Sequence, residues 1–120
     1  MKESILKNKS YDFAILIVKT CKSISEHQRE FTLSKQLLKS GTSIGANIRE
    51  AEFAQSNKDF INKMSIALKE ASETEYWLSL LKDTKYIEIK CFNSLIGYNQ
   101  ELIKMLVSTI NTMKAKLNNF

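Results

Sequence analysis

The sequence contains no proline and only three glycines among its 120 residues, so it is poor in the residue types that shape turns. A fold of many short β-strands needs a turn after each strand, and those turns draw on glycine and proline. Alanine, leucine, lysine, glutamate, isoleucine and serine dominate instead, and together they favour helix. The composition therefore predicts an all-α fold, in one domain spanning residues 1–120.

Histidine is almost absent, which bears on metal chemistry. A di-iron bundle needs glutamates together with Glu-x-x-His pairs on facing helices. His27 is the single histidine and falls in a predicted loop, so no imidazole can join Glu50, Glu70 or Glu73 if these point inward. We predict no metal and no other cofactor. Inward carboxylates would instead pair with basic side chains or accept hydrogen bonds from hydroxyls and amides.

Cysteine is also scarce, and neither Cys21 nor Cys91 suggests catalysis, because both lie on apolar faces without a partner base. The segment Gly41–Gly45 lacks the Lys-Ser/Thr pair of a phosphate-binding loop. We therefore predict that the protein is not an enzyme. Two unpaired thiols, no signal-peptide pattern and no apolar run of about eighteen residues predict a cytoplasmic protein that does not enter the membrane.

Acidic residues are outnumbered, 13 against 18 lysines and arginines, and the net charge is +5. The excess lies in residues 1–40 and 86–120. Only two of the basic residues are arginines, whereas proteins that read base sequence usually carry more. A moderate lysine excess is typical of a protein that binds nucleic acid or an acidic protein, and also of an ordinary solvated surface. The candidate phosphate contacts are Lys7, Lys9, Lys19, Lys22, Lys39, Lys114 and Lys116.

Hydrophobic periodicity predicts four helices joined by short connections. They span about residues 4–25, 32–55, 57–83 and 88–118. Thr32 or Ser34 could cap the second helix, and Asn57 could cap the third. Four helices with short links favour an antiparallel up-down-up-down four-helix bundle.

The expected core faces come from the same periodicity. In the first helix a shared face is predicted for Tyr11, Ala14, Ile15, Val18, Cys21 and Ile24. The fourth helix keeps four-three spacing from Phe92 to Leu117, with a polar break at Asn99. The apolar stripes of the third and fourth helices are wider than one core needs. Leftover apolar surface predicts a closed homo-oligomer.

The second helix carries a polar stripe beside its apolar one. The stripe consists of Gln36, Ser40, Ser43, Asn47 and Glu50, next to Leu37, Gly41, Ile44, Ile48 and Ala51. We predict an internal hydrogen-bonded seam in which Asn47 and Glu50 face Glu70, Glu73 or Thr74 of the third helix. Gly41 and Gly45 lie in the apolar region of this helix and predict close approach of a neighbouring helix.

The stretch Phe31–Leu81 resembles the signature of the four-helix-bundle family named after proteins encoded in intervening sequences of bacterial 23S rRNA genes. The resemblance is strongest in Ser-Ile-x-Ala-Asn-Ile-x-Glu at residues 43–50 and Ala-Leu-x-Glu-Ala-x-Glu-Thr at residues 67–74. Further matching residues are Leu33, Gln36, Leu37, Asp59, Phe60, Tyr76, Trp77 and Leu78.

The resemblance implies a left-handed four-helix bundle that assembles into a ring-shaped homopentamer, without enzymatic activity. It also implies kinship with the accessory variability determinant of diversity-generating retroelements, a basic pentameric barrel that binds nucleic acid and a reverse transcriptase. The family often has arginine near Lys39 and Ser40. This chain keeps only the lysine, which lacks arginine's bidentate fork.

Charge and resemblance together predict a non-enzymatic oligomer that binds nucleic acid, RNA in preference to DNA, through lysines of its outer helices. The alternative is a protein-interaction adaptor that does not bind nucleic acid.

Overall fold

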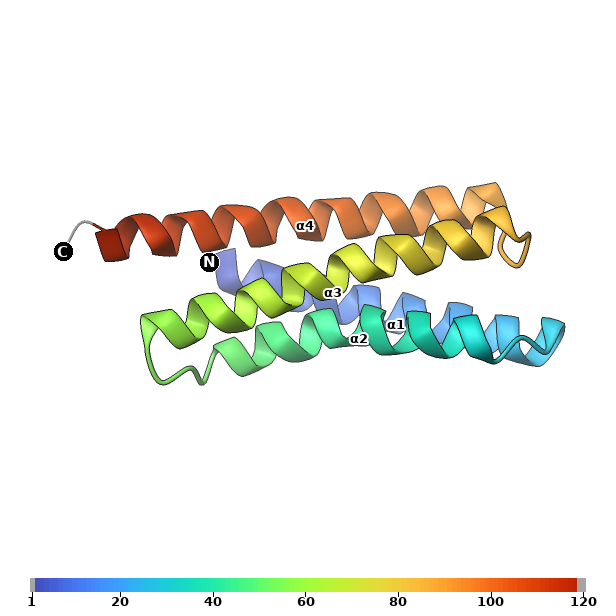
Figure 1. The fold of residues 1–120 in the computed structure, drawn as a ribbon, viewed down its shortest axis with the longest axis horizontal. Coiled ribbons are helices and arrows are strands. Elements are labelled where there is room, and N and C mark those ends of the chain that lie inside the picture. The colour runs from blue at the N-terminus through green and yellow to red at the C-terminus, as the bar shows by residue number, and fades with distance from the viewer. Residues whose placement is uncertain (1, 119–120) are drawn as a thin grey trace.

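Four long helices joined by short connections make up the described chain. The computed structural model describes the backbone of residues 2–118 and the side chains of residues 5–118. The helices are α1 (Lys2–Gln28), α2 (Thr32–Ala51), α3 (Asn57–Asp83) and α4 (Ile89–Asn118). Consecutive helices run in opposite directions, and their connections alternate between the two ends of a bundle 53 Å long (Figure 1). The predicted all-α antiparallel bundle is confirmed.

The start of α2 is capped by Glu30, and the predicted caps Thr32 and Ser34 are wrong. The Glu30 carboxylate accepts hydrogen bonds from the backbone N–H groups of Thr32, Leu33 and Ser34 at 3.1, 2.9 and 2.9 Å. Partial burial opposes the charged form, but these bonds outweigh it and lower the pKa of Glu30. One carboxylate thereby satisfies three of the donors that a helix start leaves free.

The connection between α2 and α3 lies earlier than predicted. α2 ends at Ala51 rather than near residue 55, and α3 is capped by Ser56 rather than Asn57. Ser56 Oγ accepts from the Asp59 N–H at 3.0 Å, and the Asp59 carboxylate accepts from the Gln55 N–H at 3.2 Å. This reciprocal pair resembles a capping box, which stops one helix and starts the next.

The core face of α1 is not the predicted one. Cys21 and Ile24 are buried as expected, but Tyr11, Ile15 and Val18 are exposed. The buried row consists of Leu6, Ser10, Phe13, Ile17, Cys21 and Ile24. α1 carries apolar residues on several rows, so periodicity did not distinguish the row that meets α2 and α4. Phe13 stacks on Tyr98 of α4, with ring centroids 5.4 Å apart.

Glycine allows α1 and α2 to approach closely at one position. A Cβ added at Gly41 would lie 2.8 Å from two side-chain carbons of Ile17, closer than atoms tolerate. At Gly45 the nearest atom, in Ser10, would be 3.4 Å away, which is ordinary contact. The predicted close approach is therefore confirmed, and Gly41 is the residue that requires it.

Two polar contacts tie α3 to its neighbours inside the core. The hydroxyls of Thr74 and Ser40 are 3.0 Å apart, and Asn99 donates from Nδ2 to the Ala71 carbonyl at 2.9 Å. Asn99 is fully buried and its Oδ1 has no hydrogen-bond partner. The predicted polar break in α4 therefore lies in the core, where buried polar groups help to fix helix register.

Candidate functional site

The polar stripe of α2 lies mostly at the surface, so the predicted internal seam is wrong for most of its members. Thr74 is buried, and it bonds Ser40. Ser43, Asn47 and Glu70 are half-buried, while Gln36, Glu50 and Glu73 are exposed. The core uses the adjacent row of Leu37, Gly41, Ile44 and Ile48. The stripe is therefore displaced to the edge of α2 that borders α3.

Within the stripe, Ser43 and Asn47 bond their own helix, whereas Ser40 bonds across the bundle to Thr74. Asn47 donates from Nδ2 to the Ser43 carbonyl at 2.8 Å, and Ser43 donates from Oγ to the Lys39 carbonyl at 2.6 Å. Asn47 and Glu50 form no hydrogen bond with Glu70, Glu73 or Thr74, contrary to prediction. Ser43 and Asn47 are therefore not part of an internal seam, and Gln36 and Glu50 lie at the surface.

Together these residues form a surface with three glutamates, bordered by Lys39 and Lys69 and here called the α2/α3 face: Gln36, Ser43, Asn47, Glu50, Glu70, Glu73, Tyr76 and Trp77. Partial burial and the neighbouring charge of Glu73 raise the pKa of Glu70, with Lys69 and Lys39 opposing the shift. Tyr76 is 60% exposed, and its ring meets Trp77 edge-on at 5.0 Å. Negative charge and exposed aromatic surface therefore occur side by side.

A second surface, here called the α1/α2 face, is apolar with a basic rim. It consists of the exposed Tyr11, Ile15, Val18 and Leu38 with Lys22, Lys35 and Arg49. Between the two helices runs a groove of about 740 Å³, whose lining includes Tyr11, Ala14, Gly45, Ala46 and Arg49. Three of its ten lining residues are alanine or glycine, and the charged Lys7 and Asp12 also line it.

Leftover apolar surface was predicted on the third and fourth helices, and that prediction is largely wrong. Five of the eleven large exposed hydrophobic residues among those described lie on α1, and only Tyr76, Ile89 and Val107 lie on α3 or α4. The wide stripes of α3 and α4 are half-buried against the core. The face of α1 assigned to the core is therefore the main unpartnered apolar surface.

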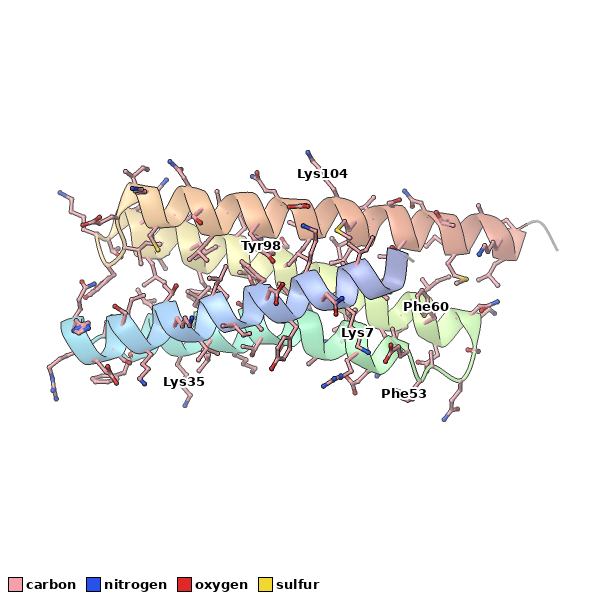
Figure 2. The ribbon with its side chains drawn as sticks, turned by 180° about the vertical axis from the view of Figure 1, so that it is seen from behind. Lys7, Lys35, Phe53, Phe60, Tyr98 and Lys104 are labelled. Carbon is pink, nitrogen blue, oxygen red and sulfur yellow. The ribbon has the colours of Figure 1, made fainter. Side chains whose placement is uncertain are left out.

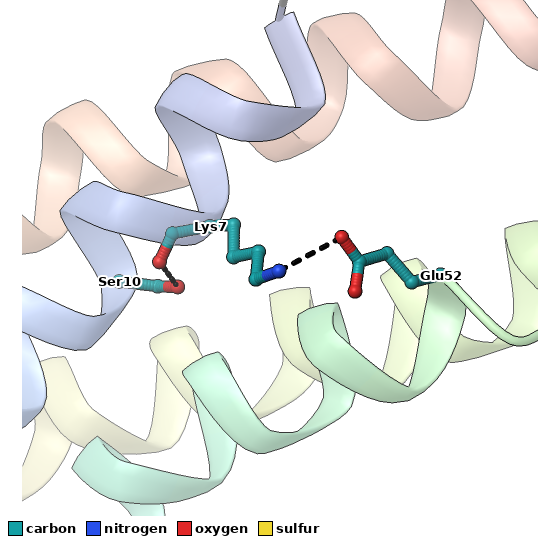
Figure 3. Close-up of polar contacts among 3 residues, drawn as sticks. All are labelled: Lys7, Ser10 and Glu52. Atoms are coloured by element: carbon teal, nitrogen blue, oxygen red, sulfur yellow. Dashed lines mark hydrogen bonds and ion pairs between the residues drawn. The ribbon is translucent and has the colours of Figure 1, made fainter.

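Two of the seven candidate lysines are held by carboxylates. Lys7 Nζ lies 2.9 Å from Glu52 Oε1, beside the hydrogen bond from Ser10 Oγ to the Lys7 carbonyl (Figure 3). Lys9 Nζ lies 2.8 Å from Glu101 and 5.8 Å from the centre of the Tyr98 ring. Hydrogen bonding to Glu101 raises the pKa of Lys9. These pairs join α1 to the residue that follows α2 and to α4, so both lysines hold the helices of the bundle together.

The other five candidate lysines are exposed and form no ion pair, but the fold separates them. Lys19, Lys22 and Lys39 lie toward the end where α1 meets α2. Lys114 and Lys116 lie at the opposite end, where α4 extends past the start of α1 (Figure 1). The distance along the bundle is roughly 35 Å at 1.5 Å per residue. Figure 2 also shows Lys35 and Lys104, which were not predicted, on opposite sides.

Residues of catalytic type are not gathered in the part of the chain that the structure describes. Burial raises the pKa of Cys21 to about 12, so its thiol stays protonated at neutral pH. Burial and then the Glu88 charge also raise the pKa of Cys91. Among residues 5–118, no three His, Cys, Asp or Glu side chains are grouped to hold a metal ion. None of the described helices is both long and apolar enough to span a membrane.

Comparison with known proteins gives a consistent result. A family model described as 23S rRNA-intervening sequence protein matches residues 2–108. A crystal structure of a protein of unknown function, from the S23 ribosomal protein family of Bacteroides thetaiotaomicron VPI-5482, is 55% identical in sequence. That match covers 92% of this chain and 99% of the other, with a TM-score of 0.91. No curated protein matches the chain.

Proposed function

This chain belongs to the family of 23S rRNA-intervening sequence proteins, and from that premise we propose that it is a non-enzymatic homo-oligomer, most simply a pentamer, that binds nucleic acid. We propose RNA in preference to DNA from the net charge of +5 and the family resemblance. Lysine recognises the phosphate backbone rather than base edges, which fits a sequence-tolerant binder. The cytoplasmic location stays a prediction from the sequence.

The observation that carries the proposal is the exposed, unpaired lysine surface. Only Lys7, Lys9 and Lys82 form ion pairs among the described residues, although the chain has 18 basic side chains. Free lysines release counterions when they meet phosphates, which provides affinity. Because Lys19 and Lys39 are far from Lys114 and Lys116 on one copy, binding through both sets needs an extended strand or several copies.

Fluorescence anisotropy with mixed-sequence single-stranded RNA and DNA tests this proposal. We expect binding near about 50 mM salt that weakens steeply as salt rises. The double substitution Lys114→Ala/Lys116→Ala should reduce the slope of log K against log salt by about 1.4, or roughly 0.7 per lost contact. Lys9→Ala is the matched control, because Lys9 is already engaged by Glu101. Binding that is absent, or insensitive to salt, overturns the proposal.

A protein-interaction adaptor is the second candidate, and the exposed aromatic and apolar residues of α1 and α3 favour it. Such an adaptor would bind a partner protein, for example a reverse transcriptase, and would be indifferent to nucleic acid. Co-purification of a stoichiometric partner by a chain that fails the anisotropy test would support this function instead.

A further inference from the structure

The α1/α2 face has the properties of a protein contact. Tyr11, Ile15, Val18 and Leu38 are between 37% and 62% exposed, on neighbouring rows of two packed helices. Contiguous apolar surface with a polar rim usually marks an interaction site. The sides of the bundle are 53 Å long and about 22 Å wide, which is large enough for the roughly 800 Å² that each partner buries in a stable interface.

Charge distinguishes among the possible occupants of this face. Lys22, Lys35 and Arg49 rim it, and none of them forms an ion pair within the described chain. Two copies of the face packed against each other would bring these cations together. The α2/α3 face carries three glutamates, Glu50, Glu70 and Glu73, against two bordering lysines, whereas the α1/α2 face carries three cations against Asp12. We propose that the α2/α3 face of a second copy docks on the α1/α2 face, in a head-to-tail contact.

The two faces lie at matching heights on the bundle. Gly41 closely approaches Ile17, and its neighbour Ser40 bonds Thr74, so these residues form one layer. Val18 follows Ile17 in sequence, and Glu73 precedes Thr74. Val18 of one face and Glu73 of the other are therefore level along the bundle axis. A second copy can therefore dock at the same height along the bundle axis. A ring requires this, because a shift at every contact would produce an open helix.

The relative orientation of the faces determines the assembly. Both include α2, so they are adjacent sides of a four-helix bundle and stand at roughly a right angle. Each head-to-tail contact rotates the next copy by the same amount, which the angle between the two faces sets. For copies at the same level, an angle near 90° closes a ring of about four or five members. Lys22 then faces a neighbouring copy instead of nucleic acid. The contact rests on the self-association proposed above and deepens it by specifying the surfaces.

A pair of valine substitutions tests the contact. We expect Val18→Glu to convert the oligomer to a 13.8 kDa monomer, measured by size-exclusion chromatography with light scattering. Val107→Glu on α4 is the matched control, because Val107 is 40% exposed and Val18 is 46% exposed. Val107→Glu should keep the wild-type mass. Circular dichroism confirms that both variants remain helical. An assembled Val18→Glu variant, or a dissociated control, overturns the assignment.

Charge exchange gives an independent test, which keeps the inference falsifiable if Val18→Glu does not fold. Lys22→Glu/Arg49→Glu should weaken association at least tenfold, because in this register Lys22 and Glu73, and likewise Arg49 and Glu70, lie within about 8 Å of each other along the axis. Adding Glu70→Lys/Glu73→Lys to the same chain should restore it, since every head-to-tail contact then carries the reversed pair. Failure of restoration overturns the pairing.

The outcomes separate this inference from the proposed function. A monomeric wild-type protein contradicts the proposed oligomer and the contact together. An oligomeric wild type that is unaffected by Val18→Glu contradicts only the contact. Salt-sensitive RNA binding is measured separately, with the Lys114→Ala/Lys116→Ala variant on α4, which belongs to neither face, so its loss does not bear on which surfaces meet.

Discussion

The two sides of α2 differ in what they bury and what they leave exposed. Toward α1, Gly41 allows such close packing that only a narrow row is buried, and the apolar Tyr11, Ile15 and Val18 remain outside. Toward α3, the Ser40–Thr74 hydrogen bond lies inside, while the acidic and amide groups lie outside. The comparison shows that the core buries only one row of α2 and leaves the polar and apolar rows beside it at the surface. The remaining apolar and acidic surfaces are complementary, which is why we assign them to a contact between copies.

The largest single effect is expected on the α3 side, at Thr74. Thr74→Ala removes the buried hydroxyl contact with Ser40 and a buried methyl group, so we expect the free energy of unfolding to fall by about 1–3 kcal/mol. Urea denaturation measures the change. Glu75→Ala, the exposed neighbour, should stay within about 0.5 kcal/mol. Equal losses in both variants would contradict the distinction between the inside and outside of this helix pair.

On the α1 side, two glycines of the same helix should respond with opposite signs. Gly41→Ala gains about 1 kcal/mol of helix propensity but overpacks against Ile17, at a cost of about 1–3 kcal/mol, so we expect net destabilisation. Gly45→Ala meets only ordinary contacts and should stabilise by up to about 1 kcal/mol. Thermal and urea unfolding measure both. Stabilisation by Gly41→Ala would show that α1 and α2 are less tightly packed.

A smaller effect should appear in the pH dependence, where two carboxylates act oppositely. The pKa of Glu30 is lowered, so its contribution to stability is present above the usual carboxyl range and is lost as pH falls. The pKa of Glu70 is raised, so its contribution is present at acid pH and is lost as pH rises through the raised value. Substitution of either glutamate by the neutral glutamine removes the pH dependence of stability that this carboxylate contributes.

Urea denaturation between about pH 3 and pH 7 measures these slopes. Glu30→Gln should lose more stability relative to wild type at neutral than at acid pH, while Glu70→Gln should gain relative to wild type as pH rises. Parallel curves for the two variants would contradict the opposite environments assigned to them.

Sequence periodicity predicted the helices well because long amphipathic segments and short polar links leave few alternatives. The end of α3 at Asp83 and the burial of Asn99 are both confirmed. The core face of α1 could not be predicted, because Tyr11, Ile15 and Val18 are as apolar as the buried row. Only packing against Gly41 and Tyr98 decides between the rows. The row of α1 that is buried also determines which of its apolar residues remain exposed.

The candidate site was harder to predict than the fold. The Ser43–Glu50 motif correctly indicated the family, yet helical spacing could not show that Ser43 and Asn47 bond their own helix. The carboxylates that engage Lys7 and Lys9 come from distant parts of the sequence, so nothing local separates these lysines from free ones. The sequence analysis missed Lys35, Arg49 and Tyr76. Nothing in the local sequence shows which surface of the folded bundle each of them borders.

Cross-linking between the two faces tests the central claim most directly. Val18→Cys and Glu73→Cys would be combined in a chain whose Cys21 and Cys91 are replaced by alanine, and then treated with a short bis-maleimide. We predict a ladder of covalent multimers that ends at the size of the ring, and no cross-linked product from either single variant. A chain that remains monomeric after treatment, or a dimer from Val18→Cys alone, would contradict the head-to-tail contact.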